Sequence, residues 1–501
     1  MTKAALPHRS GPHTGHRARA CASLVFVAVA SLGATAHAGE LTRVATAAEK
    51  DNKWDFHFGV GYDFDFKRAS ILRETTSNGA TVLSRDLVYQ QFRHTITPTL
   101  EFGLYQDLSL YTALPVVAAD DRQYALDQRA GSECVYPSDV TPGSGLEVNC
   151  VDKTNSSTIR DGIVPVNGWD AKAGDAQGGP FGQYTAPNTE LIFTGPQRRG
   201  LDQLHVGLKK GILAQRKWSH LPNLVVAFEG RFAVGKAMTL DKRDPDAAGN
   251  SRVGRRIHEL GFWTALSRRF RFFEPFFGGY ARWAVRASNS EFDAPARAEQ
   301  INPQHTAGFA VGTEIVPWEN KAEQKKVAFI LRGTGDYRYG GRGYSEIWEL
   351  LADSPALVGT SDPANETCDP LAAVEYAQAN PSDPSGYLEQ VNTANGSQCR
   401  SFRGVTNLDN YASFGLNGAF AFHMGKYARL LVGANLGTDT RHFLSRANRG
   451  NPTRSGDPGV VEPDSVDVNP LRRDVIDNVG RRYAISDVVS AVGYLQLWLT
   501  F

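Results

Sequence analysis

The sequence has almost no excess of charge of either sign. Its 54 Lys and Arg residues balance 53 Asp and Glu residues, which leaves a formal net charge of +1. A nucleic-acid-binding chain needs a clear positive excess for long-range attraction, and an acidic disordered tail needs a negative one. We therefore expect no nucleic-acid partner, and the partners must be inferred from the pattern of residues.

Good helix formers are also scarce. The chain has only 3 Met but 49 Gly, together with 26 Phe, 17 Tyr and 8 Trp. Gly is poor in helices, whereas aromatic residues are enriched in strands. This composition predicts strands and turns. At 501 residues, the chain has the length of about three soluble domains or of one large barrel.

An apolar run long enough for a transmembrane helix, about 18 residues or more, is missing as well. The longest apolar stretch, residues 22–36, follows several arginines and leads into the tripeptide AHA at residues 36–38. A basic start, a short apolar segment and a small-x-small site are typical of a secretory signal peptide. The sequence thus predicts a cleaved signal peptide over residues 1–38, followed by a short periplasmic lead over residues 39–53.

The chain has only five cysteines, and Cys21 lies in the predicted signal peptide. The four that remain form two pairs close in sequence, Cys134 with Cys150 and Cys368 with Cys399. In an oxidising exported compartment this arrangement predicts two local disulfides, while a zinc site would need close-set Cys or His pairs that are missing. We expect neither a metal nor any other cofactor.

A strict alternation of apolar and polar residues begins at residue 54. Residues 54–67 read WDFHFGVGYDFDFK, so every even position is apolar and every odd one after Trp54 is polar or Gly. Successive side chains of a strand point to opposite faces, so one face of this strand is apolar throughout. A soluble β-sandwich does not need a strand of this length with one fully apolar face.

The same alternation recurs eleven more times, which makes twelve predicted strands. An even number of alternating strands behind a signal peptide indicates a bacterial outer-membrane barrel. We therefore predict an all-β fold, a 12-stranded antiparallel transmembrane β-barrel over residues 54–501, with a secreted β-sandwich as the less favoured alternative. The eleven further segments are residues 92–104, 108–116, 204–212, 224–234, 260–266, 277–285, 309–315, 327–339, 414–422, 430–436 and 495–501.

The connections between these segments alternate in length. Short turns on the periplasmic side and long loops outside are typical of outer-membrane barrels, and aromatic residues beside the short turns predict an interfacial girdle. The short connections are residues 105–107, 216–222, 268–275, 317–325 and 424–427, and the long ones are residues 73–85, 118–200, 236–252, 288–303, 340–405 and 440–480.

The final strand carries a further signal. Leu497, Leu499 and Phe501 place apolar residues at alternate positions and an aromatic residue last, which resembles the C-terminal assembly signal of outer-membrane barrels. We expect this strand to engage the barrel-assembly machinery and then to pair with the strand that starts at Trp54. That pairing would remove both exposed edges, which neither water nor lipid tolerates well.

Charged residues occupy the face that should point into the lumen, in nearly equal numbers of each sign. Opposite charges on neighbouring strands can pair across the ladder, so these residues either hold the barrel together or form a polar path for a solute. Their balance argues against a strongly ion-selective pore. The lumen-lining candidates are Glu229, Arg231, Glu259, Arg282, Arg286, Glu314, Arg332, Asp336 and Arg338.

Motifs for catalysis are weak. Gly230, Gly235 and Lys236 nearly complete a phosphate-binding loop, but the required hydroxyl residue is Ala237 and the segment continues a strand. A barrel phospholipase would need Ser and His within hydrogen-bond reach, about two residues apart on a strand, and no predicted strand has them. The acidic loop segments lack calcium-loop spacing. We predict that the chain is not an enzyme and has no catalytic residues.

Two stretches resemble a family of proteobacterial outer-membrane barrels described as transporters of the phenol-degradation MetA pathway. Residues 102–115, FGLYQDLSLYTALP, are similar to the family's Gly-led hairpin that ends in Leu-Pro or Pro. Residues 200–210, GLDQLHVGLKK, are similar to its Gly-Leu-Gly-Asp strand start, although the second Gly is missing here. The resemblance implies passage of small hydrophobic or aromatic compounds and supplies no site residues.

Together these patterns predict a bacterial outer-membrane channel for small molecules, surrounded by lipid and lipopolysaccharide. Twelve strands should enclose a narrow lumen. We expect the loop over residues 118–200, assisted by the apolar segment 347–351 of the loop 340–405, to constrict it, since loops this long are usually functional or disordered. Two alternatives stay open: an interaction barrel that acts through its outer loops, and a lipid hydrolase.

Overall fold

The computed structural model describes residues 42–48, 53–77, 79–127, 151, 155–164, 169–170, 191–242, 244, 246–292, 302–360, 368–380, 386–395, 399–450 and 468–501. The predicted signal peptide and the cysteines Cys134 and Cys150 lie outside the described residues, as do parts of the predicted long loops. Within the described ranges, each helix is too short or too polar to cross a membrane.

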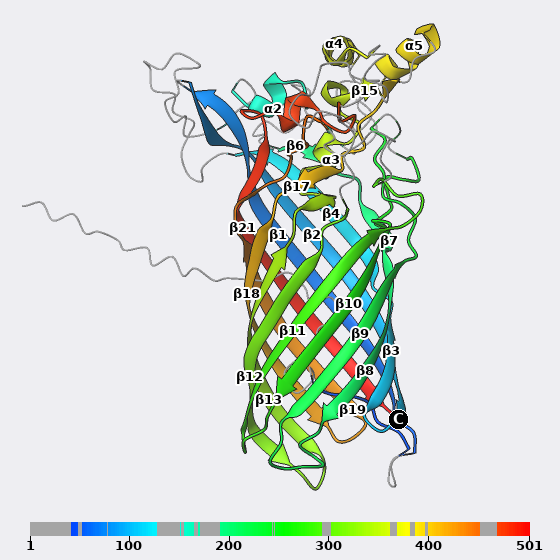
Figure 1. Cartoon of the computed structure of the whole chain (residues 1–501), viewed down its shortest axis with the longest axis vertical. Coiled ribbons are helices and arrows are strands. Elements are labelled where there is room, and N and C mark those ends of the chain that lie inside the picture. Colours follow the sequence, from blue (N-terminus) through cyan, green and yellow to red (C-terminus); the bar gives the residue numbers. More distant parts are fainter. Residues whose placement is uncertain are drawn as a thin grey trace, which may run out of the picture.

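Twelve antiparallel wall strands close into a barrel (Figure 1). Each pairs with the wall strand before it, and the last, β21 (Tyr483–Thr500), pairs with the first, β1 (Phe56–Ser77). The predicted fold class is therefore confirmed. Between these two come β2 (Ala80–Tyr105), one interrupted strand made of β3 (Leu108–Ala113) and β4 (Val116–Leu126), then β8 (Gln203–Leu213), β9 (Asn223–Ala233), β10 (Ile257–Ser267), β11 (Phe273–Arg286), β12 (Thr306–Asn320), β13 (Lys325–Arg338), β18 (Tyr411–Met424) and β19 (Ala428–Asp439).

The alternation in the sequence sorts side chains between the two faces of the wall as predicted. On β1, Tyr62 and Phe64 are exposed on the outer face, whereas His57 points inward and is only 2% exposed. Exposed apolar residues such as Phe228 of β9 and Phe420 of β18 continue this pattern around the ring. The barrel therefore carries an apolar belt on its outside.

The two ends of the barrel differ, and we call them the turn end and the cap end. Short turns lie at the turn end, where the chain also finishes beside the start of β1 (Figure 1). The last residue, Phe501, exchanges two backbone hydrogen bonds with Phe56. The turn end carries exposed aromatic residues in or beside its short turns, as predicted: Trp54, Tyr105, Trp218, Phe270, Phe272, Trp318 and Tyr427.

The wall is taller at the cap end than the alternation predicts. The prediction of a loop over residues 73–85 is wrong, because β1 and β2 stay paired up to Ser77 and Ala80. Residues 118–126 also belong to the wall, as the upper part of β4. In this upper part the register shifts after Ile71, and side chains on the inner face are buried by loops. Because the outer face no longer carries the apolar belt, the alternation that marks the lower strands fades here.

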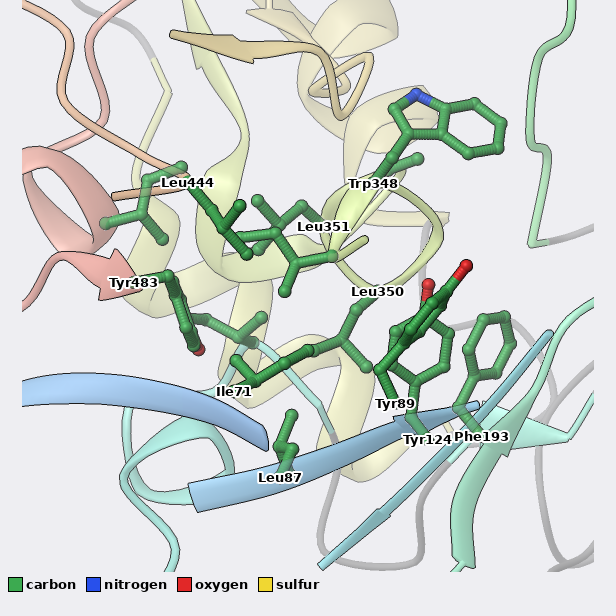
Figure 2. Packing of buried hydrophobic residues seen from close by; sticks show 14 of the residues in the cluster. Ile71, Leu87, Tyr89, Tyr124, Phe193, Trp348, Leu350, Leu351, Leu444 and Tyr483 are labelled. Atoms are coloured by element: carbon green, nitrogen blue, oxygen red, sulfur yellow. The ribbon is translucent and has the colours of Figure 1, made fainter. Parts of the chain in front are cut away.

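Loops from both halves of the chain meet over the cap end and form a continuous hydrophobic core, which we call the cap. Its centre is α3 (Trp348–Leu351), from which Leu350 points toward Ile71, Leu87 and Tyr89 of the tall wall (Figure 2). Around it lie α2 (Ser157–Arg160), η1 (Pro355–Leu357), α6 (Asp474–Asp477), β5 (Trp169–Asp170), β6 (Leu191–Thr194), β7 (Arg198–Leu201), β14 (Gly341–Gly343), β17 (Thr406–Leu408) and β20 (His442–Phe443).

A smaller unit projects beyond the cap and has its own apolar cluster. It contains α4 (Pro370–Ala379), α5 (Gly386–Asn395) and the strand pair β15 (Gly359–Thr360) with β16 (Cys399–Arg400). The structure contains the predicted disulfide between Cys368 and Cys399 at the base of this unit, which we call the disulfide lobe. The predicted partner bridge, Cys134 to Cys150, lies outside the described residues and stays a prediction.

Candidate functional site in the barrel lumen

The lumen contains a cavity of about 350 Å³. Side chains from most of the wall strands line it, and Arg43 from the segment before the first strand lies at its margin. Ligand-binding cavities in proteins usually measure about 300–1,000 Å³ and combine apolar walls with a few polar groups. This cavity has the size for one small molecule.

One sector of the cavity wall is held by ion pairs. Glu229 of β9 accepts hydrogen bonds from the Tyr111 hydroxyl at 2.5 Å and from Nε of Arg231 at 2.6 Å. Glu101 of β2 accepts a hydrogen bond from Lys209 at 3.1 Å. Because each of these two carboxylates has a cation beside it, this sector matches the reading of lumen charges as internal ion pairs that hold neighbouring strands together.

Four of the nine predicted lumen residues line the cavity: Glu229, Arg231, Arg282 and Arg332. Four of the other five lie on the inner face of the barrel around it. Glu259 is within 4 Å of both Arg231 and Arg282. Further residues take part in other contacts of the inner face, which are Glu314 to Lys326 at 2.6 Å, Asp336 to the Tyr280 hydroxyl at 2.6 Å, and Arg338 over the Tyr411 ring at 5.5 Å.

The prediction that Arg286 lines the lumen is wrong. Arg286 is the last residue of β11 and is exposed, and its guanidinium donates a hydrogen bond to the carbonyl of Phe292. Its position in the alternation matches the lumen face, but the strand ends there, so the side chain lies at the rim. The alternation along a strand shows on which face a residue lies, but it does not show where the strand ends.

Aromatic rings on the lumen side contact glycines of the neighbouring strands. A Cβ at Gly207 would overlap the ring of Tyr111, and one at Gly433 would overlap the ring of Tyr494. Rings that cover a glycine in this way leave the lumen open and shield the glycine backbone. The same pairing holds for Phe276 with Gly312, Tyr280 with Gly308, and Trp498 with Gly59. Sequence reading missed these pairs, because it treated the lumen glycines only as non-apolar positions.

A second apolar cluster lies on the inside of the barrel, beside the charged lumen residues. Phe276, Ile330 and Leu431 are almost fully buried on the inner faces of their strands, and Tyr494 and Trp263 connect this cluster to the cavity. The lumen therefore has an ion-paired sector on one side and an apolar sector on the other. The remaining cluster members are Ala265, Val316, Ala328, Ala419 and Ala421.

The turn end of the lumen is crossed by residues 42–47, part of the predicted lead. The Thr42 hydroxyl lies 2.8 Å from that of Ser267 on β10, five strands from β1 around the ring. The backbone N–H of Ala45 donates to Glu101 at 3.3 Å, and Arg43 approaches His57 at 3.4 Å. This segment, which we call the N-terminal strap, therefore runs inside the opening of the barrel.

The cap end of the lumen is closed by α3, which ion pairs hold to the wall. Glu349 is fully buried and accepts a hydrogen bond from Nε of Arg198 at 2.5 Å, with Arg122 of β4 at 3.8 Å. Just before α3, Glu346 pairs with Lys67 of β1 at 2.7 Å. Burial by itself would raise the pKa of Glu346, but the Lys67 ammonium outweighs burial and holds this pKa below its usual value.

A further cation is enclosed in the cap. Lys242 is fully buried, and its ammonium donates to the carbonyl of Leu350 at 2.9 Å. Burial lowers the pKa of Lys242 to about 7, against the opposing effects of Asp353 and Glu349. The cap thus contains an amine whose protonation changes near neutral pH. Among the described residues, no group of three or more His, Cys, Asp or Glu side chains is placed to hold a metal ion.

Several solved structures of outer-membrane proteins are similar to this chain in fold. An outer-membrane channel from Pseudomonas putida F1 has a TM-score of 0.34 and 8% identity, and the match covers 88% of this chain and 96% of that one. A FadL homologue of Pseudomonas aeruginosa has a TM-score of 0.26 and 8% identity, covering 89% and 90%. The outer-membrane protease OmpT of Escherichia coli has a TM-score of 0.28 and 6% identity, covering 92% and 100%.

No known protein family matches the sequence, and no curated protein is significantly similar to it. The resemblance to the phenol-degradation transporters is therefore not confirmed. Because the structural similarities have TM-scores below 0.5, we assign the fold from the closed strand ladder of this chain itself. The function is inferred from the lumen.

Proposed function

We propose that the chain is a bacterial outer-membrane channel for small molecules of hydrophobic or aromatic character. The observation that carries this proposal is a cavity of about 350 Å³ inside a closed ladder whose outer face is apolar. Closure pairs the backbone groups of the wall, which lipid cannot satisfy, and the apolar belt is what a bilayer requires. In this proposal the turn end faces the periplasm and the cap faces outward.

The aromatic bands support this orientation in a membrane. Exposed Trp and Tyr residues at the turn end would lie at one interface, and Trp283, Tyr337 and Tyr339 near the upper ends of β11 and β13 would lie at the other. Leu497 and Phe501 are exposed on the last strand, where the proposed assembly signal would be accessible. Contacts with lipopolysaccharide and with the barrel-assembly machinery follow from this placement and belong to the proposal.

Transport requires that both closures of the lumen open. The strap crosses the turn end, and α3 fills the cap end, so the structure represents a closed state of the proposed channel. The expected constriction by residues 347–351 agrees with the burial of Ile347 and Trp348 in the cap. The loop 118–200 supplies α2 and β6 to the same core, and its role in solute choice remains a proposal.

The interaction barrel is the second candidate, and one observation favours it. The disulfide lobe projects beyond the cap, and its surface carries an apolar side chain, Leu371, that is 67% exposed. A barrel whose task is binding at the cell surface would need no opening of the lumen. The absence of catalytic activity stays a prediction.

Planar-bilayer recordings of the full-length protein test the choice. We expect discrete conductance steps that increase when residues 345–353 are replaced by a short Gly-Ser linker, because this removes α3 from the lumen. The control is heat modifiability on a gel, which should be unchanged if the barrel is intact. If the shortened protein is still a heat-modifiable barrel and conducts no better than its parent, the channel proposal fails and the interaction barrel is favoured. Fractionation of cells tests the outer-membrane location.

A further inference from the structure

We propose that the lumen cavity binds a small aromatic molecule that carries a negative charge, of the arene-carboxylate class. The inference names a ligand class for the proposed channel and rests on that function for its biological sense. It depends on three features of the cavity: the positions of its charges, the aromatic rings in its wall, and the apolar cluster beside it.

The charges that line the cavity are segregated. Its lining carboxylates are Asp63 and Asp65 of β1, Glu101 of β2 and Glu229 of β9. The part of the lining that the structure describes from β12 through β21 contains no carboxylate, but it contains the guanidinium groups of Arg332 and Arg429. Asp63 of β1 is paired in register with Tyr494 of β21, so the part of the lining that favours an anion is the one at Arg332 of β13 and Arg429 of β19.

The same side of the cavity is aromatic. Tyr494 and Trp498 of β21 line it together with Arg332 and Arg429, and the Arg429 guanidinium lies 5.5 Å from the centre of the Trp498 ring. A cation whose one face rests on a ring still presents N–H groups at its edge, which are the groups that bind a carboxylate. A ligand with a ring and a carboxylate would use both surfaces at once.

Two further cations of the cavity are paired with rings in the same manner. Arg282 lies 4.8 Å from the centre of the Tyr280 ring, and Lys209 lies 4.8 Å from that of Tyr111. Each ring contacts a glycine of a neighbouring strand, Gly308 for Tyr280 and Gly207 for Tyr111. Rings at the cavity wall favour an aromatic ligand over a branched aliphatic one, because aromatic rings gain from offset or edge contacts with other rings.

The apolar cluster provides a surface against which the ring of the ligand can be buried away from water. Trp263 and Tyr494 belong to the cavity wall and also touch the cluster around Phe276 and Ile330. The strap and α3 narrow the two ends of the lumen, and charge interactions are stronger where less water surrounds them. A neutral aromatic molecule would use only the rings, and a simple inorganic anion would use only the arginines.

The test is calorimetric titration of the full-length protein in detergent with three ligands of nearly equal size: benzoate, benzyl alcohol and benzylamine. We expect benzoate to bind about tenfold or more tightly than the other two, since a charge-assisted hydrogen bond is worth about this factor. Arg332→Gln should weaken benzoate about tenfold and leave benzyl alcohol nearly unchanged. Arg332→Lys should recover part of the loss.

Arg286→Gln is the matched control, because it removes the same charge from β11 at a position outside the cavity, and it should leave benzoate binding unchanged. Heat modifiability shows whether each variant folds. If Arg332→Gln does not fold, Arg429→Gln replaces it, with the same expected loss.

Equal affinity for benzyl alcohol, tighter binding of benzylamine, or no binding of any of the three would overturn the inference. Bilayer recordings separate this failure from failure of the channel: conductance without benzoate preference removes only the ligand class, and benzoate binding without conductance removes only the channel.

Discussion

The two closures of the lumen are built differently. The cap is a folded unit in which α3 is fully buried, with Glu349 paired to Arg198 at 2.5 Å. The N-terminal strap has no comparable core and is held mainly by separate hydrogen bonds, such as Ala45 to Glu101 at 3.3 Å. A net hydrogen bond contributes about 1 kcal/mol, whereas burial of one large apolar side chain contributes about 2–3 kcal/mol. The strap should therefore release far more easily than the cap.

The strongest test of this difference is Glu349→Gln. The change leaves the buried guanidinium of Arg198 without its anion, and loss of one partner of a buried pair costs about 3–5 kcal/mol. We expect faster hydrogen exchange of amides in residues 345–357, with heat modifiability unchanged. Glu346→Gln is the control, because Glu346 is partly exposed and its loss should cost less. Unchanged exchange in Glu349→Gln would show that the ion pair does not hold the cap.

A smaller effect, of opposite sign, is expected at Lys242. Its pKa of about 7 in the folded cap lies below the ordinary value of 10.5, so the unfolded cap binds more protons between these two values. The free energy of cap unfolding should therefore rise from pH 7 to about pH 10 and be lowest below pH 7. Lys242→Met should stabilise the cap by about 1–4 kcal/mol at pH 6 and flatten this dependence.

Hydrogen exchange of the cap at pH 6 and pH 9, in the parent and in Lys242→Met, measures this effect after correction for intrinsic exchange rates. A parent cap that is more stable at pH 6 than at pH 9 would contradict the assignment of Lys242 as a buried amine that loses its proton on folding.

Much of the barrel was predictable because lipid and lumen impose opposite chemistry on alternate residues. The run from Trp54 to Lys67 shows this plainly, and the pairing of the last strand with the first follows from the need to remove both edges. Where the wall rises above the apolar belt that constraint ends, and there the predicted strand ends near Ile71 and at the start of β4 were wrong.

The site was predictable only in part, because its main contacts join residues far apart in the chain. Arg231 and Arg332 were assigned to the lumen by parity. The pairing of Arg198 with Glu349 spans 151 positions, and that of Ala45 with Glu101 spans 56, so no local pattern signals either. The rings over glycines had a weak signal, since a glycine inside a strand marks close approach by another group.

Removal of the strap should have a moderate effect on access to the lumen. In a variant with Thr97→Cys on the cavity wall, deletion of residues 39–48 should increase the rate of labelling by a small charged thiol reagent about tenfold, which corresponds to loss of one or two net hydrogen bonds. Thr46→Ala removes the hydrogen bond that the Thr46 hydroxyl accepts from the backbone N–H of Asp107, and it should give a smaller increase than the deletion. Equal labelling with and without the strap would mean that it does not close the turn end.

The smallest effect on lumen access is expected from breaking the Cys368–Cys399 disulfide. The bridge closes a loop of 31 residues, so its loss should loosen the lobe itself by about 2–4 kcal/mol. The lobe has its own apolar cluster, and it meets the cap where α4 lies beside η1 and Val374 packs against the cap core. Its disorder should therefore transmit little to α3.

Paired Cys368→Ser and Cys399→Ser substitutions in the Thr97→Cys background should leave labelling of the cavity within about twofold of the parent, since changes at surface positions away from the site are usually within about 0.5 kcal/mol. Proteolysis of residues 361–398 should become faster in the same protein. A large rise in cavity labelling would show that the lobe helps to close the cap end of the lumen. The cap would then include α4. The contrast between a strongly built cap and a weakly held strap would remain, but the cap would open from its outermost element inward.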